Sequence, residues 1–82
     1  MDIEKCKTFK TVVDTGSFRA AATQLNKVQS AISYDIRSLE RDLGTVLFDR
    51  THYRPKLTKV GAAFYNRCIQ FLNELHSHPI AA

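Results

Sequence analysis

The stretch that decides the fold is residues 16–44, which read GSFRAAATQLNKVQSAISYDIRSLERDLG. Gly16 suits the left-handed backbone position at which a helix ends, and the Ser17 side chain is suited to cap the helix that follows. Beyond Ser17 the apolar residues recur at intervals of three and four up to Leu25. This spacing predicts a short helix that ends near Asn26.

The second half of the stretch predicts a longer helix with two different faces, which Gly44 closes. At about 100° per residue its apolar side chains cluster on one side and should face a core. These side chains are Ile32, Ile36, Leu39 and Leu43. The opposite side carries two bases and no acid, and it comprises Ser30, Ser33, Tyr34, Arg37 and Arg41. A polar, basic face is therefore expected to point outward.

The flanking segments predict one more helix and a small ribbon. Residues 2–14 place apolar side chains at helical spacing along one side, which predicts a first helix. Residues 46–48 and 54–58 are two short extended candidates, and Pro55 in the second is compatible with an edge strand. The expected fold is mainly α, with three helices and a two-stranded ribbon before a last helix.

Thr58 is suited to cap this last helix, and Pro79 marks a point by which it must have ended. The helix carries two apolar stripes about 100° apart on the helical wheel. One stripe is Phe64, Cys68, Phe71 and Leu75, and the other is Tyr65, Ile69 and Leu72. One small domain cannot cover both stripes, so part of this helix is expected to pack against another chain.

Size and charge limit the possible functions. With 82 residues the chain forms one small domain, and folding at this length buries only roughly 60% of the surface that the unfolded chain exposes. The formal net charge is +4, and residues 50–59 contain four bases and no acid. So concentrated a basic run favours an anionic partner.

The two cysteines favour a reducing compartment. Cys6 and Cys68 lack metal-type spacing, and no signal-peptide pattern opens the sequence. Both fall on apolar stripes, where a free cysteine behaves as a small hydrophobe, although a disulfide between them is the alternative. No apolar run approaches the roughly 20 residues that span a bilayer, so no membrane partner is expected.

Catalytic and metal sites receive little support. The sequence has no glycine-rich phosphate loop, no HExxH or GxSxG motif, and no paired-carboxylate cleft is plausible in so short a chain, so an enzyme is not expected. His76 and His78, with Cys68 upstream, offer metal-binding atoms, but the histidines lie in a terminal segment without further ligands nearby. We expect no metal and no cofactor.

A short helix, a tight turn and a longer helix with a polar outer face form the unit that places its second helix in the major groove of DNA. Gln29, Ser30 and Ser33 lie near the start of that helix and are suited to hydrogen-bond with base edges. The basic ribbon, 50–56, would then lie on the backbone or in the minor groove. The alternative is a winged-helix module that serves only protein assembly, and absent or salt-insensitive binding to DNA duplexes would favour it.

At this point a family resemblance is visible. The motif residues are Gly16, Ser17, Phe18, Ala21, Ala22, Leu25, Gln29, Ala31, Ser33, Ile36, Leu39, Glu40, Leu43, Gly44, Leu47, Phe48 and Arg50. In this order and spacing the chain resembles the amino-terminal domain of LysR-type transcriptional regulators. Leu57, Thr58 and Gly61 continue the match, which covers about residues 2 to 75.

The resemblance implies a winged helix-turn-helix domain over 1–58 and a linker and dimerisation helix over 59–78, with 79–82 as a tail at the point of truncation. It also implies a longer cytoplasmic protein whose carboxyl-terminal domain, absent here, binds a small inducer. Such regulators bind interrupted palindromes in double-stranded DNA as dimers, which pair through the last helix and assemble further into tetramers.

The resemblance also supports the expected site residues. Those expected to contact bases are Gln29, Ser30, Ser33, Tyr34 and Arg37. Those expected at the backbone or minor groove are Lys27, Arg41, Arg50, His52, Arg54 and Lys56. Those expected in the dimer are Phe64, Tyr65, Cys68, Ile69, Phe71, Leu72 and Leu75.

Three positions depart from the family pattern. Val28 cannot cap where serine is frequent, Ser30 stands where proline is usual, and Tyr34 stands where arginine is frequent. The sequence preference is therefore expected to differ from that of typical members.

Overall fold

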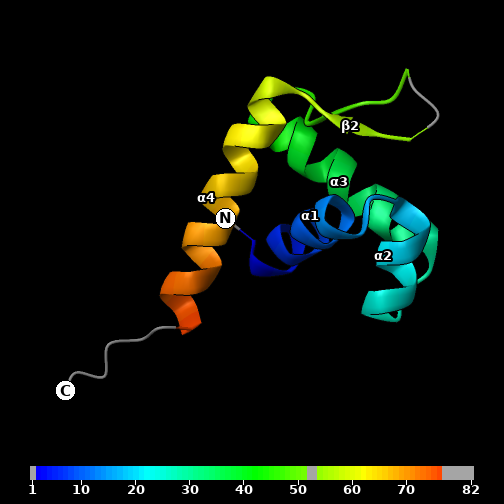
Figure 1. Cartoon of the computed structure of the whole chain (residues 1–82), viewed down its shortest axis with the longest axis horizontal. Coiled ribbons are helices and arrows are strands. Elements are labelled where there is room, and N and C mark those ends of the chain that lie inside the picture. The colour runs from blue at the N-terminus through cyan, green and yellow to red at the C-terminus, as the bar shows by residue number, and fades with distance from the viewer. Residues whose placement is uncertain (1, 52–53, 77–82) are drawn as a thin grey trace.

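The structure, a computed structural model, describes residues 2–51 and 54–76, and this part of the chain forms four helices and a two-stranded ribbon (Figure 1). The elements in chain order are α1 (Ile3–Thr15), α2 (Phe18–Leu25), α3 (Gln29–Leu43), β1 (Phe48–Asp49), β2 (Lys56–Leu57) and α4 (Lys59–His76). The predicted mainly α, winged helix-turn-helix fold is therefore confirmed.

Local capping residues determine most helix boundaries. The side chains of Asp2, Ser17 and Thr58 each accept a hydrogen bond from a backbone N–H in the first turn of α1, α2 and α4. At their other ends, α1 and α3 stop at Gly16 and Gly44, which adopt left-handed conformations with φ of 82° and 69°. These boundaries agree with those predicted from the sequence.

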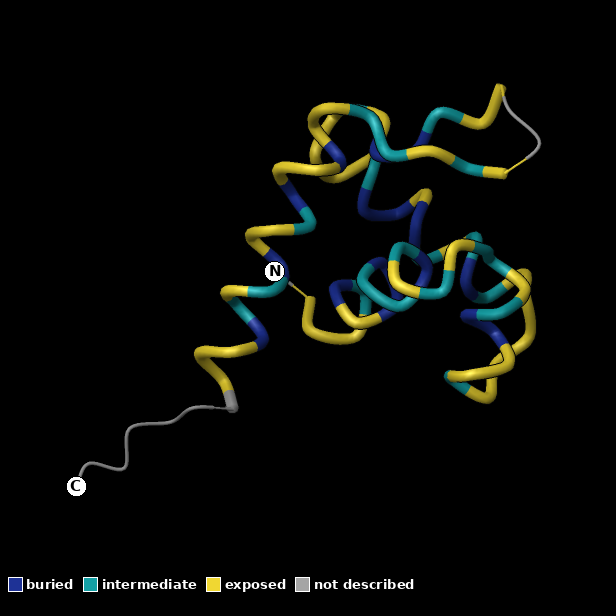
Figure 2. The backbone as a smooth tube through the Cα atoms, viewed as in Figure 1, coloured by how far each residue is buried: buried dark blue, intermediate teal, exposed yellow. Residues whose placement is uncertain are grey.

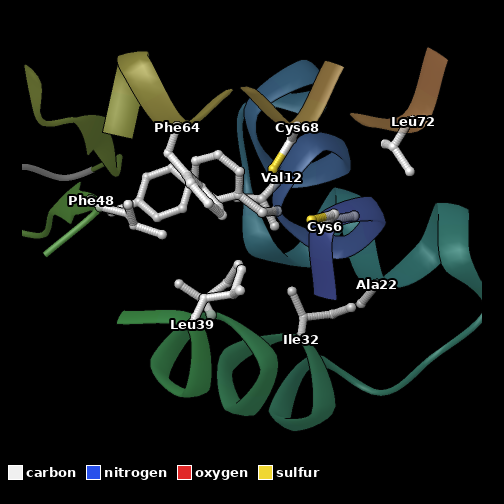
Figure 3. Packing of buried hydrophobic residues seen from close by; sticks show 13 residues of the cluster. Cys6, Val12, Ala22, Ile32, Leu39, Phe48, Phe64, Cys68 and Leu72 are labelled. Carbon is white, nitrogen blue, oxygen red and sulfur yellow. The ribbon is translucent and has the colours of Figure 1, made fainter. Parts of the chain in front are cut away.

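The core lies between α1 and the elements around it, because α1 packs against α2, α3 and α4 (Figure 2). Phe9 of α1 is fully buried, and its ring centroid lies 5.4 Å from that of Phe48 and 5.3 Å from that of Phe64. Ile32 and Leu39 of α3 complete this cluster from the opposite side (Figure 3). The aromatic contacts tie the ribbon and α4 to the first helix.

The interface between α1 and α3 also contains buried polar side chains, which periodicity alone does not predict. Thr8 donates a hydrogen bond to Asp35 at 3.0 Å, and Lys5 donates one to Ser38 at 2.6 Å. Because these partners satisfy them, Thr8 and Ser38 are buried without an unpaired polar atom. Leu43, which the sequence places on the core side, is instead 45% exposed in the last turn of α3.

The ribbon is shorter than the predicted extended segments. β1 and β2 pair antiparallel, with Phe48 opposite Leu57 and Asp49 opposite Lys56. Val46 lies outside the strand and is 55% exposed, and its carbonyl oxygen accepts a hydrogen bond from the Thr58 hydroxyl at 2.8 Å. Within the described residues, none of the helices is apolar over a length that would cross a membrane.

Candidate nucleic-acid interface

Helix α3 presents a polar, basic face to solvent, as its sequence pattern predicts. Ile32, Ile36 and Leu39 are buried, so the opposite side of the helix is the one left free. The side chains that we expected to contact bases are Gln29, Ser30, Tyr34 and Arg37, all exposed, and Ser33, half-buried. Tyr34 is 62% exposed, and it belongs to the few large apolar or aromatic residues that remain at the surface.

The bases on α3 are not neutralised by their own helix. An alternative explanation for these charges is that Arg37 and Arg41 pair with Glu40 or Asp42 of the same helix. Within residues 2–51 and 54–76, neither arginine forms an ion pair. Their positive charge is therefore available to an external anion.

A concave surface lies between the start of α2, the first turns of α3 and the ribbon. This wing hollow has a volume of about 660 Å³ and is lined by Ser17, Phe18, Arg19, Gln29, Ser33, Arg50, Arg54 and Pro55. It brings the predicted base-contacting residues Gln29 and Ser33 together with two predicted backbone-contacting arginines. Helix α3 and the ribbon therefore line one continuous surface, to which Arg19, Arg50 and Arg54 contribute positive charge.

Arg19 is a candidate that the sequence reasoning missed. It is exposed on α2 and lines the wing hollow beside Gln29. The sequence pattern could have identified Arg19, because it lies outside the apolar stripe of α2 and a basic side chain at such a position points away from the core. It adds a positive charge at the edge of the surface that α3 and the ribbon form.

Arg50 is held in place by contacts to two other elements. Its guanidinium Cζ lies 5.2 Å from the centroid of the Phe18 ring, and its Nη2 lies 3.6 Å from Oε1 of Glu40. The other carboxylate oxygen of Glu40 accepts hydrogen bonds from the backbone N–H groups of Leu47 and Phe48 at 2.8 and 3.3 Å. Glu40 thus connects α3 to the first strand of the ribbon and to its arginine.

The remaining predicted backbone contacts differ in their surroundings. Arg41, Arg54 and Lys56 are exposed. The ammonium group of Lys27 instead lies 3.9 Å from Glu4 of α1 and 4.0 Å from Asp35 of α3. These two acids offset its charge in the free protein. His52 lies outside the described residues.

Helix α4 divides the predicted dimerisation residues into two groups, which corrects our assignment of the stripes. Phe64, Cys68 and Leu72 are buried in the chain's own core, because steps of four residues follow one side of an α-helix. They leave no surface for a partner. Ile69 and Phe71 are half-buried, and Leu75, in the last turn of α4, is 46% exposed. The C-terminal end of α4 extends beyond the other helices (Figure 1).

Tyr65, also expected in the dimer, contacts its own chain. Its hydroxyl donates a hydrogen bond to Asp14 at the end of α1, and Lys10 donates one to the same carboxylate at 2.7 Å. Burial raises the pKa of Asp14, but the hydrogen bonds from Lys10 and Tyr65 outweigh it and hold this pKa below its ordinary value. The hydrogen bond of Tyr65 joins α4 to the end of α1.

The two cysteines both lie in the core as thiols, and the structure does not contain the alternative, a disulfide between them (Figure 3). Both are fully buried, Cys6 on α1 and Cys68 on α4. Burial, with the hydrogen bond to Cys6, raises the pKa of Cys68 to about 12. Both cysteines therefore act as core side chains. His78, which we considered with His76 and Cys68 as a possible metal ligand, lies outside the described residues.

Comparison with known proteins agrees with this geometry. Residues 3–62 match the family described as bacterial regulatory helix-turn-helix proteins of the lysR family. The regulator AceR of Acinetobacter baumannii is 39% identical over 95% of this chain, and YtlI of Bacillus subtilis is 46% identical over 82% of it. The chain spans 28% and 21% of the length of these two transcriptional regulators.

Solved structures show the same fold. The DNA-binding domain of BenM in complex with its benA site superimposes with a TM-score of 0.90 at 32% identity, covering 94% of this chain and 86% of that one. The corresponding CbnR complex with DNA gives a TM-score of 0.89 at 34% identity, covering 94% and 88%. With the match over residues 3–62, these similarities show that the chain belongs to the lysR family of bacterial regulatory helix-turn-helix proteins.

Proposed function

We propose that this chain binds double-stranded DNA in a sequence-specific manner, with α3 in the major groove and the ribbon on the backbone or in the minor groove. The observation that carries the proposal is the free basic face of α3, continuous with a hollow that three arginines line. The major groove is about 12 Å wide and accepts a helix. BenM and CbnR, which share the fold, have been solved with DNA.

The residues proposed to read bases lie on the exposed side of α3. Gln29 and Ser33 line the wing hollow at the start of the helix, where a helix-turn-helix protein reads base edges. Gln29 has the donor and acceptor pair that matches adenine, and Arg37 has the fork that matches guanine. Ser30 and Tyr34 flank them and are proposed as further base contacts.

The residues proposed to contact the backbone or minor groove surround this face. They are Arg41, Arg50, Arg54 and Lys56, with Arg19 added from the structure and His52 retained from the sequence. Lys27 is proposed to contribute least, because Glu4 and Asp35 lie beside its ammonium group. Each phosphate contact adds about 0.9 to the slope of log K against log salt concentration.

We further propose that the whole protein regulates transcription in the bacterial cytoplasm as a dimer that pairs through α4 and assembles into a tetramer. Its relatives are named as transcriptional regulators and are about four times as long as this chain. An inducer would bind in the part of such a protein that this chain does not span. The operator would be an interrupted palindrome, and neither a catalytic role nor a cofactor is proposed.

Fluorescence anisotropy on random and promoter duplexes at several salt concentrations tests DNA binding. The domain should bind, and its affinity should fall steeply as salt rises. Arg54→Ala in the wing hollow should weaken binding, whereas Lys7→Ala, which removes the same charge from the exposed side of α1, should not. Absent or salt-insensitive binding on every duplex would favour the protein-assembly alternative.

A further inference from the structure

Val28 occupies the N-cap position of the proposed recognition helix without acting as a cap. Its backbone is extended, with φ −78° and ψ 152°, and its side chain makes no capping hydrogen bond. It is 68% exposed, the largest exposed fraction among the large apolar side chains that the structure describes. The carbonyl of Val28 accepts the first backbone hydrogen bonds of α3, but its side chain neither caps the helix nor packs in the core.

The other three helices of the described chain each begin at a polar cap, namely Asp2, Ser17 and Thr58. Serine, threonine, aspartate and asparagine are strongly preferred at this position because they satisfy free N–H groups of the first turn. An exposed valine at this position gives up that hydrogen bond. A contact between the valine side chain and a binding partner would offset the loss of the capping hydrogen bond.

The surface around Val28 indicates where that contact lies. With its neighbours Lys27 and Gln29, Val28 lines a second hollow, of about 480 Å³, beside the end of α2. Arg19 and Gln29 line this hollow and also the wing hollow, so Val28 lies next to the surface proposed to meet DNA.

We propose that Val28 packs against the 5-methyl group of a thymine in the major groove and so helps to determine the sequence that the domain selects. This inference rests on the proposed DNA binding by α3. The thymine methyl is the apolar feature of the base edges in that groove, and an apolar side chain recognises it by contact. Gln29, the next residue, is suited to an adenine, so the two side chains together favour neighbouring A·T pairs.

Replacement of single thymines by 2′-deoxyuridine tests the proposal, because this change removes the methyl group and leaves the hydrogen-bonding groups in place. The starting duplex is one selected by the wild-type domain from a random pool. At one thymine the replacement should weaken binding by about fourfold, the effect expected for one buried methyl group. At thymines away from Val28 it should have no effect.

The variant that isolates the side chain is Val28→Ser, which removes both methyl groups and supplies a capping oxygen. It should bind thymine and deoxyuridine duplexes equally, while its thermal midpoint rises by about 4 °C because α3 gains a cap. A loss of discrimination in this variant cannot then be attributed to misfolding. Val60→Ser, at a second exposed valine in the first turn of α4, should keep the wild-type discrimination.

Three results would overturn the proposal. The first is a wild-type domain that binds its selected duplex but is insensitive to every thymine replacement, which leaves DNA binding itself intact. The second is a Val28→Ser variant that retains the thymine discrimination of the wild type. The third is absence of binding to any duplex, and this outcome would overturn the proposed function as well.

Discussion

The guanidinium group of Arg50 lies over the ring of Phe18, with its Cζ atom 5.2 Å from the ring centroid. Phe18 in turn contacts Phe48 in an edge-on arrangement, with ring centroids 5.7 Å apart. The arginine is therefore held against the start of α2, and Glu40 holds its other side. Because the side chain is ordered before any ligand binds, less conformational entropy remains to be lost on binding.

This arrangement predicts different outcomes for two substitutions of Arg50. Arg50→Ala should weaken binding to every duplex and lower the salt slope by about 1. Arg50→Lys keeps the charge but loses the contact of the guanidinium with the Phe18 ring, so affinity should fall about threefold with an unchanged slope. Salt titrations followed by anisotropy measure both quantities. If Arg50→Lys binds as the wild type does, this contact contributes nothing to DNA binding.

The Asp14 carboxylate, which Lys10 and Tyr65 share, predicts a pH dependence of stability. Its pKa is lowered in the folded state, so its contribution is complete above the unfolded pKa of about 4 and is lost as the pH falls through the lower folded value. The pKa values of Tyr65 and Lys10 are raised by their hydrogen bonds to Asp14. Their contribution is complete below about pH 10 and is lost at higher pH.

Thermal midpoints of the wild type and Asp14→Asn, measured from pH 3 to pH 11, test this prediction. The variant should be less stable at pH 7, and the difference between the two proteins should shrink toward both ends of the range. Tyr65→Phe keeps the contact between Lys10 and Asp14, so its thermal midpoint should fall by less than that of Asp14→Asn. A difference that does not vary with pH would contradict the assignment.

Gly61 predicts a steric effect at the junction between the ribbon and α4. A Cβ atom at this position would lie 2.2 Å from the Leu47 carbonyl oxygen and 3.0 Å from Cδ2 of Leu57. The same carbonyl already accepts a hydrogen bond from the Thr58 N–H, so it cannot move without cost. Gly61→Ala should therefore lower the free energy of unfolding by about 1 to 3 kcal/mol.

In a domain of this size each kcal/mol corresponds to about 4 to 8 °C in the thermal midpoint, so the change is easily measured. Ala63→Ser, two residues further along α4 and exposed, should leave the midpoint nearly unchanged. If Gly61→Ala matches the wild type, the backbone at Leu47 yields more readily than the contact distances indicate.

The helices and their ends were predictable because their signals are local. The stops at Gly16 and Gly44 and the caps at Ser17 and Thr58 depend on a few adjacent residues, and periodicity identified the buried stripes of α1 and α2. The family motif added the order of the elements. Nothing in these signals required knowledge of a distant contact.

The details that escaped prediction depend on contacts between distant residues. Ser38 is buried because Lys5, on another helix, reaches its hydroxyl. Leu72, rather than Phe71, completes the buried side of α4. The helical wheel shows which residues share a side of α4, but it does not show which side α1 covers. Arg50 forms an ion pair with Glu40, because the ribbon brings its side chain next to α3.

The buried thiols predict that the native protein resists thiol reagents. Cys6 and Cys68 are fully buried, and burial raises the pKa of both thiols, so little reactive thiolate exists at neutral pH. A chromogenic disulfide reagent should label two thiols rapidly in denaturant. It should label the native protein only as fast as the core opens. Fast labelling of a folded sample, verified by circular dichroism, would contradict the burial of this pair.

The free side of α4 predicts how copies of this chain associate. Leu75 is exposed beyond the core and Ile69 is half-buried, so a charge at either position should disrupt a helix pair without opening the domain. Sedimentation at high micromolar concentration should show a dimer for the wild type and a monomer for Leu75→Glu or Ile69→Glu. Gln70→Glu introduces the same charge at an already polar, exposed position and should remain dimeric. Thermal midpoints equal to that of the wild type would show that the variants fold. A wild type that is strictly monomeric would contradict the prediction that copies of this chain pair through α4.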